Sequence, residues 1–176
     1  MAGKVVGVFV DVSNLYYCIG KKYRRKLNYE KYLKQAINGQ ELYRAFAYGA
    51  QLNDKAVDFI TCLRHYGYDP KYKKPKQYFT TNTLQTCPNC NVKLTTDKKE
   101  NRKADWDVGI AMDVVRIIDR LDTVVIGSAD GDLVSLVEWV KEKGRLCTVL
   151  ACGISRDLKD VVDHWEEIGE SLLEES

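Results

Sequence analysis

The sequence predicts a three-layer α/β/α domain in which helices cover both faces of a mostly parallel sheet. Short apolar runs rich in β-branched residues alternate along the chain with longer segments whose apolar residues recur at helical spacing. The apolar runs are continuous, which is typical of strands that are buried on both faces. This alternation favours a parallel sheet with helices on both sides. The 176 residues suffice for one domain with a substantial core.

The N-terminal part of the chain is expected to supply two strands and three helices. The strands are residues 4–11 and 41–50, and the helices are residues 13–20, 28–38 and 55–66. The third helix carries Val57, Ile60 and Leu63 at helical spacing. It ends at Gly67, a residue type that commonly stops helices.

Residues 68–103 are the least regular part of the chain. They contain all three prolines, many lysines and threonines, and a Cys87-Pro88-Asn89-Cys90 turn. Prolines and turn residues interrupt regular elements. We therefore expect an extended strand followed by a hairpin-like insertion that contains the two cysteines.

The remaining residues continue the alternation of strands and helices. A helix is expected over residues 105–120, with Val108, Ala111, Met112 and Val115 as its apolar face. The elements that follow are a strand at 122–126, a helix at 132–143, a strand at 146–151, a turn at 154–158 and an acidic helix at about 159–176. Because no repeat or clear linker interrupts this order, we interpret residues 1–176 as a single domain.

Neither a membrane span nor a secretory signal is expected. No apolar stretch approaches the roughly 18 to 20 residues that cross a bilayer. The N-terminus lacks the apolar core and the cleavage site of a signal peptide. Six cysteines in such a chain are typical of reduced thiols or metal ligands. These features predict a cytoplasmic protein.

Charge is distributed unevenly, although the net charge is only +2. Five positive charges fall within Lys21–Lys26 and four within Lys71–Lys76, whereas residues 159–176 hold seven acidic groups and one lysine. Solvated loops would explain the basic runs. However, tyrosines lie among the lysines, as in surfaces that stack bases and hold phosphates. The candidate residues for binding a nucleic-acid substrate are Lys21, Lys22, Arg24, Arg25, Lys73 and Lys74.

Aspartates stand at the ends of three apolar runs. They are Asp11, the pair Asp105 and Asp107, and the pair Asp130 and Asp132. Carboxylates at the carboxyl ends of parallel strands point toward the place where open α/β sheets bind ligands. Several carboxylates close together repel one another unless a cation neutralises them. Hard oxygen donors suit Mg²⁺ or Mn²⁺, so the pattern indicates a metal site for phosphate chemistry.

Helix capping is the alternative explanation for several of these aspartates. Asp11 or Ser13 would cap the helix that follows, and Asp132 also stands at a helix start. Of Asp105 and Asp107, one is expected to cap the next helix and the other to face the site.

Two neighbouring residues are also ambiguous. Asp113 lies about 120° around the predicted helix from Asp107, and an ion pair with Arg116 is favoured over a role in the site. Lys103 would contact a scissile phosphate or serve as one more loop lysine.

The sequence disfavours three other classes of chemistry. The turn after the first strand lacks the glycine-rich loop of a dinucleotide-binding fold. Ser13 stands where a haloacid-dehalogenase-like phosphatase needs a second aspartate. The two histidines have no evident triad partners, which argues against nucleophilic Ser-His-Asp catalysis.

Three segments together resemble the motifs of NYN domains, which are relatives of the PIN nucleases. Phe9-Val10-Asp11-Val12-Ser13-Asn14-Leu15 is similar to the opening motif, and Trp106-Asp107-Val108-Gly109-Ile110-Ala111-Met112-Asp113 to the central helix. Gly127-Ser128-Ala129-Asp130-Gly131-Asp132-Leu133 resembles the third motif, with Ala129 and Leu133 as mild departures. The resemblance runs from residue 4 to about 151. It implies a PIN-like fold with a flap-endonuclease-like sheet.

The resemblance also implies an activity and its residues. The acidic metal-binding residues would be Asp11, Asp107, Asp130 and Asp132, with Asn14 and Ser128 as polar partners. RNA would be the substrate, and we predict a metal-dependent ribonuclease acting on single strands. The alternative is a non-catalytic RNA-binding or scaffold module that keeps the fold. A homodimer is a reasonable expectation for a soluble oligomer.

The cysteines leave a zinc site open. Cys87 and Cys90 have the spacing of half a zinc knuckle, but a structural site needs four ligands. Three alternatives stay open. Cys62 and His65 complete a zinc site, two chains share one, or the turn binds no metal. The other three cysteines, Cys18, Cys147 and Cys152, are expected in the core.

Overall fold

A six-stranded sheet in which all neighbouring strands are parallel forms the centre of the molecule. The structure is a computed structural model that describes residues 3–50, 55–73, 76–80, 85–86, 93–94, 99–103 and 106–175. Across the sheet the strands lie in the order β10 (His164–Glu167), β9 (Leu146–Ala151), β8 (Thr123–Gly127), β1 (Val5–Asp11), β2 (Glu41–Ala50) and β3 (Tyr68–Lys73). This arrangement confirms the predicted α/β fold class.

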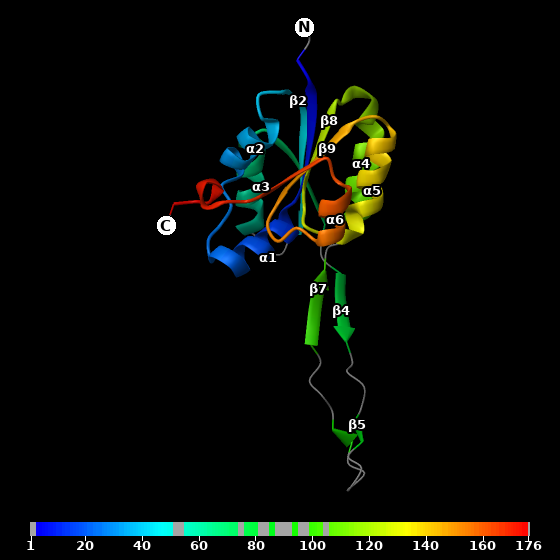
Figure 1. Ribbon diagram of the computed structural model, residues 1–176. Coiled ribbons are helices and arrows are strands. Elements are labelled where there is room, and N and C mark those ends of the chain that lie inside the picture. The colour runs from blue at the N-terminus through cyan, green and yellow to red at the C-terminus, as the bar shows by residue number, and fades with distance from the viewer. Residues whose placement is uncertain are drawn as a thin grey trace.

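Helices cover both faces of the sheet (Figure 1). They are α1 (Val12–Tyr23), α2 (Tyr29–Ile37), α3 (Lys55–His65), α4 (Asp107–Ile117), α5 (Val134–Glu142) and α6 (Arg156–Val161). Short 3-10 turns are η1 (Ile118–Arg120), η2 (Gly131–Leu133) and η3 (Glu170–Leu172). Helices α2 and α3 lie on one face, and α4 and α5 lie on the other, which completes the three predicted layers.

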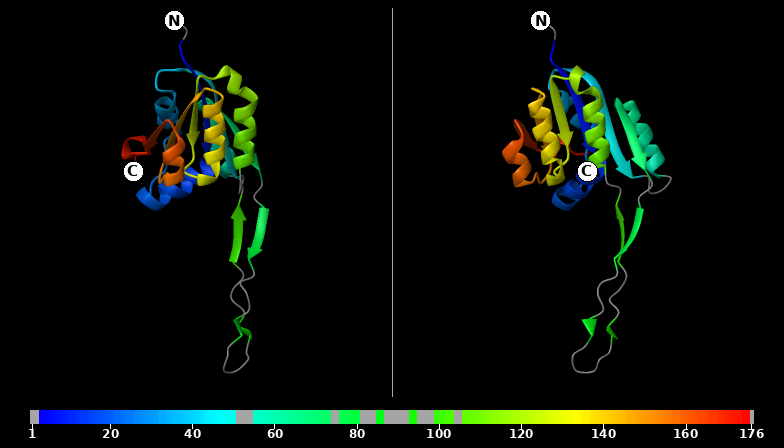
Figure 2. Two further views of the ribbon diagram at one scale, coloured as in Figure 1. Left: turned by 45° about the vertical axis from the view of Figure 1, so that its right-hand side comes forward. Right: turned by 90° about the vertical axis from the view of Figure 1, so that its right-hand side faces the viewer.

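The predicted irregular segment contains antiparallel ribbons. After β3, strand β4 (Lys76–Thr80) pairs with β7 (Lys99–Lys103), and β5 (Gln85–Thr86) pairs with β6 (Lys93–Leu94). The β4–β7 ribbon projects from the end of the sheet at which β1 runs into α1 (Figure 2). The expected strand followed by a hairpin-like insertion therefore agrees with the described residues. None of the helices in the described ranges is long and apolar enough to cross a bilayer.

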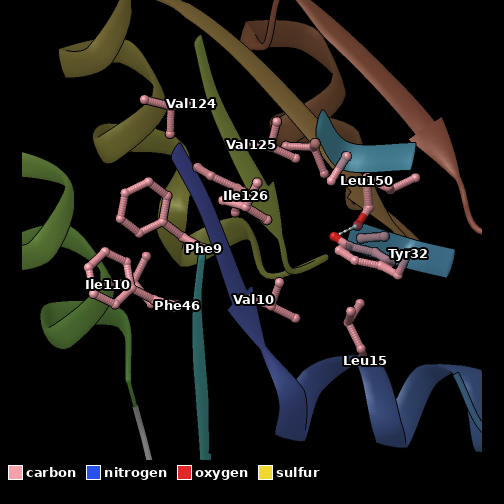
Figure 3. Packing of buried hydrophobic residues seen from close by; sticks show 14 of the residues in the cluster. Phe9, Val10, Leu15, Tyr32, Phe46, Ile110, Val124, Val125, Ile126 and Leu150 are labelled. Atoms are coloured by element: carbon pink, nitrogen blue, oxygen red, sulfur yellow. Dashed lines mark hydrogen bonds between the residues drawn. The ribbon is translucent and has the colours of Figure 1, made fainter. Parts of the chain in front are cut away.

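The core is densest around the two central strands β1 and β8. Phe9 of β1 stacks on Phe46 of β2, with 5.5 Å between the ring centroids, and both face Ile110 of α4 (Figure 3). The register pairs Phe9 with Ile126 of β8. Residues paired in this way point to the same face of a sheet. This apolar layer holds α4 against the strand ends.

Tyr32 of α2 packs on the opposite face of the same strands. It is fully buried, and its hydroxyl donates a hydrogen bond of 2.7 Å to the carbonyl of Leu150 (Figure 3). Gly127 gives the hydroxyl room, because a Cβ there would lie 2.5 Å from Tyr32 Oη and 3.2 Å from Val10 Cα. The glycine at the end of β8 is thus a requirement of close packing.

The prediction of an acidic C-terminal helix over residues 159–176 is wrong. The predicted turn at 154–158 instead leads into α6, whose first turn is capped by Ser155. The residues that follow form β10, η3 and extended chain. Backbone pairing with β9 decides the outcome, since it gives the segment a parallel partner strand. The helical spacing of Trp165, Ile168 and Leu172 was therefore misleading.

The predicted apolar face of α4 is also wrong. Val108 is 77% exposed, and Met112 and Val115 are exposed as well. The buried positions of this helix are Ile110, Asp113 and Val114. Counting only apolar residues assigned the wrong face, because the buried face contains a charged side chain that is neutralised by its neighbours.

Candidate functional site

The strand order reverses between β1 and β8. From β1 the chain proceeds through β2 and β3 to one edge of the sheet, and from β8 it proceeds through β9 and β10 to the other. Open parallel sheets bind ligands outside the carboxyl ends of the strands at such a point. Asp11 ends β1, and Ser128 directly follows β8. The predicted site residues of both strands therefore lie at the switch point.

Three carboxylates meet there. Oxygen atoms of Asp107, Asp130 and Asp132 lie within 4.8 Å of one another. Asp107 begins α4, whereas Asp130 and Asp132 belong to the turn after β8. Three negative charges at this separation repel one another unless a cation lies among them. The donors are all carboxylate oxygens, so this carboxylate group fits a hard divalent ion such as Mg²⁺ or Mn²⁺.

Asp11 has a different local role. It is buried, and its Oδ1 accepts a hydrogen bond of 3.0 Å from the backbone N–H of Asn14, which caps α1. Among the described residues it does not belong to the group of three mutually close carboxylates. The structure thus brings together three of the four predicted acidic residues and gives the fourth the capping role.

Asn14 and Ser128 join the two halves of the switch point. The side-chain oxygen of Asn14 accepts a hydrogen bond of 3.0 Å from the backbone N–H of Ala129, which links α1 to the turn after β8. Ser128 is fully buried, and its hydroxyl oxygen accepts a hydrogen bond from the N–H of Asp130. Asp130 in turn caps η2 by accepting from the N–H of Asp132 at 3.1 Å. These bonds fix the backbone that carries two of the acids.

Trp106, for which no role was predicted, fixes the position of the third acid. Its indole N–H donates to the carbonyl of Gly49 at 2.9 Å, and its ring packs on Tyr48 with 5.4 Å between centroids. A Cβ at Gly109 would lie 2.7 Å from this ring, so the glycine permits the close approach. Trp106 therefore anchors the start of α4 and, with it, Asp107.

A buried ion-pair network anchors the next turn of α4. Asp113 accepts hydrogen bonds from Lys71 at 2.6 Å, from the Tyr48 hydroxyl at 2.9 Å and from Arg116 at 3.0 Å. Burial alone would raise the pKa of Asp113, but these three donors outweigh it and hold the pKa below its usual value. The predicted ion pair with Arg116 is confirmed, and Lys71 and Tyr48 complete it.

The candidate substrate-binding cations differ in their surroundings. Lys21 and Lys22 lie in the last turn of α1 rather than in a loop, and Arg24 ends that helix with a left-handed backbone. Lys22 approaches Glu167 at 3.9 Å, and Arg25 donates to the carbonyl of Glu174. Lys73 lies over the Trp106 ring at 4.3 Å. The acidic C-terminal segment thus neutralises part of the basic run.

Cys18 lies on α1 next to Asn14. Burial raises the pKa of its thiol; Lys21 opposes this, while Asp11 and Asp130 add to it. Its Sγ contacts Asn14 Oδ1 at 3.9 Å. The prediction of core cysteines is confirmed for Cys147 and Cys152, whereas Cys18 is half-buried next to the site.

Several predicted residues cannot be placed at the site. Asp105, Lys74, Cys87 and Cys90 lie outside the described residues, and Lys103 ends β7 without a described side chain. Within the described residues, Cys62 and His65 belong to no group of three potential metal ligands. Zinc binding at the Cys87–Cys90 turn stays a prediction.

Fold and site together define an α/β protein with clustered carboxylates at its switch point. The NYN domain profile matches residues 5–169, and the chain therefore belongs to the NYN domain family. It is 22% identical over 173 residues to the low amplitude and bright protein LabA of Synechococcus elongatus, covering 94% of this chain and 84% of that protein.

A solved structure supports the same fold. A protein of unknown function from Vibrio parahaemolyticus superposes with a TM-score of 0.78 at 27% identity. The match covers 97% of this chain and 96% of that one. The predicted family is thus confirmed, and with it the relation to PIN-like nucleases.

Proposed function

We propose that the protein is a metal-dependent ribonuclease that hydrolyses phosphodiester bonds in single-stranded RNA. The observation that carries this proposal is the meeting of Asp107, Asp130 and Asp132 within 4.8 Å at the switch point. Family membership supports the same class of reaction. A protein that only bound RNA would gain nothing from clustered like charges, which repel phosphate as well as one another.

The residues of the site have different roles in the proposed reaction. The three carboxylates hold Mg²⁺ or Mn²⁺, and Asp11 adds a fourth negative group at the end of β1. A divalent ion in such a site supplies positive charge for the developing charge on phosphate and lowers the pKa of water. Asn14 and Ser128 keep the acidic turn in position through their backbone hydrogen bonds.

Cations of the two basic runs, together with Lys103, bind the RNA backbone. Lys21 and Arg24 are exposed at the end of α1, and Lys73 stands at the end of β3. In the sequence Lys74 directly follows β3, and Lys103 is the last residue of β7. Their charges hold phosphates, so binding should weaken as salt rises.

The test is cleavage of a labelled single-stranded RNA by the wild type, Asp130→Asn and Asp119→Asn. Asp119 is an exposed aspartate beyond the end of α4 and serves as the matched control. With Mn²⁺ or Mg²⁺ we expect cleavage by the wild type and the control, and no cleavage in EDTA. Asp130→Asn should lower the rate about 100-fold or more, because several kcal/mol of charge stabilisation depend on the ion.

Thermal unfolding supplies a readout that is independent of turnover. Mn²⁺ should raise the Tm of the wild type and of Asp119→Asn, but not that of Asp130→Asn, since an ion that binds only the folded state stabilises it. Tight RNA binding without cleavage in either metal would instead favour the non-catalytic RNA-binding module. Unchanged cleavage by Asp130→Asn would reject the site.

A further inference from the structure

A hollow of about 300 Å³ begins one residue beyond Asp11. Its walls come from α1, the segment between α1 and α2, the first residue of α2, α3 and the C-terminal segment, which lie on one side of the sheet (Figure 1). The lining includes Val12, Tyr16, Arg25, Lys26, Tyr29 and Phe59. We call this feature the aromatic hollow.

Three aromatic side chains, Tyr16, Tyr29 and Phe59, contribute to its lining. Tyr29 is buried and meets Phe59 edge to face, with 5.3 Å between the ring centroids. Phe59 is 37% exposed and Tyr16 is 69% exposed, so both rings are accessible from solvent. Burial raises the pKa of Tyr29, and the Asp11 and Glu174 carboxylates add to this.

The basic side of the hollow is held in a fixed shape. The Arg25 guanidinium donates to the Glu174 carbonyl, and the N–H of Glu174 donates to the Lys26 carbonyl at 2.9 Å. An antiparallel bridge joins Leu27 to Leu173. A binding site that is organised before its ligand arrives loses less entropy on binding. The C-terminal segment therefore preforms this wall of the hollow.

We propose that the aromatic hollow binds a nucleobase of the RNA strand, with Tyr16 and Phe59 as the stacking residues. The inference rests on the proposed function and names a subsite of that substrate. A base is flat, apolar on its faces and flanked by phosphates, so aromatic rings beside the exposed Lys26 complement it. Val12 lines the hollow and directly follows Asp11 in the chain, so a strand bound in the hollow would extend toward the end of β1.

Adjacent tyrosines on α1 offer a matched pair of variants. Tyr16 is 69% exposed and lines the hollow, whereas Tyr17 is 68% exposed and is not among the lining residues. Truncating either ring changes the same helix by the same amount, so only the hollow distinguishes them. Binding of a short single-stranded RNA is measured in the Asp130→Asn background, in which the strand stays intact. Tyr16→Ala should weaken binding about 5- to 100-fold, and Tyr17→Ala should not weaken it.

Strands with one abasic position identify the ligand as a base. At one position, removal of the base should weaken binding to the parent protein and cause no further loss in Tyr16→Ala, since both changes delete the same contact. In the active background Tyr16→Ala should raise KM by the same factor and leave kcat nearly unchanged.

Three outcomes would overturn the inference. Equal effects of Tyr16→Ala and Tyr17→Ala, unchanged RNA binding in Tyr16→Ala, or abasic losses that add fully to Tyr16→Ala would each show that no base occupies the hollow. If RNA binding is unchanged in Tyr16→Ala, the aromatic hollow would instead be a docking site for a protein partner. Because binding does not require turnover, a wild type that fails to cleave RNA would reject the proposed nuclease without deciding this test.

Discussion

Substitution of Asp113 by asparagine should destabilise the protein and thereby test how α4 is held on the sheet. Asp113 is buried and accepts hydrogen bonds from Lys71, Tyr48 and Arg116. Asparagine keeps the size of the side chain but removes its charge. The Lys71 ammonium, which is only about a third exposed, would then lose its partner.

The magnitude follows from the burial of each partner. Hydrogen bonds to a charged group contribute about 1.5–3 kcal/mol each, and this applies to the Lys71 and Tyr48 bonds. The Arg116 bond is largely exposed and adds little. Since asparagine still accepts one bond, we expect a loss of about 3 kcal/mol. For a domain of this size that lowers the Tm by about 6–12 °C.

Urea and thermal unfolding of Asp113→Asn beside Asp119→Asn give the measurement. The exposed control should stay within about 0.5 kcal/mol of the wild type. The pKa of Asp113 is lowered from 3.8 in the folded state, so its contribution is complete above that pH and is lost as the pH falls through the folded-state pKa. The difference between wild type and Asp113→Asn should therefore be constant near neutrality and shrink in acid. Equal stability of the two variants would refute the reasoning.

Two further substitutions test the close packing around the site. Gly127→Ala should cost about 1–3 kcal/mol by forcing a Cβ to 2.5 Å from Tyr32 Oη, and Tyr32→Phe should relieve part of this although alone it costs about 1 kcal/mol. Strictly additive losses in urea unfolding would contradict this clash. Trp106→Phe removes the hydrogen bond that holds the start of α4 to Gly49. We expect the free energy lost in nuclease activity, measured by kinetics, to exceed the loss in the free energy of unfolding. Equal losses in the two measurements would count against this role.

Strands were the best predicted part of the fold. The bounds of β2 and β9 agree with the predicted residues 41–50 and 146–151. Buried parallel strands are recognisable because both faces need apolar residues, which makes the run continuous. The C-terminal segment lacked this signal. Three of the four residues of β10 are exposed and two are glutamates, and only their pairing with β9 makes them a strand.

The acidic site was predicted as far as strand ends allow. Parallel strands bring their carboxyl ends to one edge, so the turn after β8 had to lie beside Asp11. Which carboxylates meet depends on side-chain directions, and a capping hydrogen bond turns Asp11 toward Asn14. The spacing of residues in the sequence does not determine these side-chain directions.

The aromatic hollow could not be foreseen from local patterns, because its walls combine α1, α2 and α3 with the C-terminal segment, which lies far from them in the sequence. One signal was present in the sequence. Tyr16 and Tyr17 are adjacent on a helix and point about 100° apart. Both side chains are exposed, although the exposed face of an amphipathic helix is normally polar. Exposed aromatic residues that are not packed in the core are therefore candidates for ligand binding.

The chain offsets part of the repulsion within the carboxylate group before any cation binds. Asp107 stands in the first turn of α4, where the helix dipole favours negative charge. Asp130 accepts a backbone N–H, and that N–H belongs to Asp132. Two separate anchors also hold the acids: Trp106 holds the start of α4 with Asp107, and Ser128 holds the turn that carries Asp130 and Asp132. These anchors are hydrogen bonds to backbone groups, and none of them links one carboxylate to another. The three carboxylates can therefore be held in place before a metal ion binds, and their negative charge then attracts the ion.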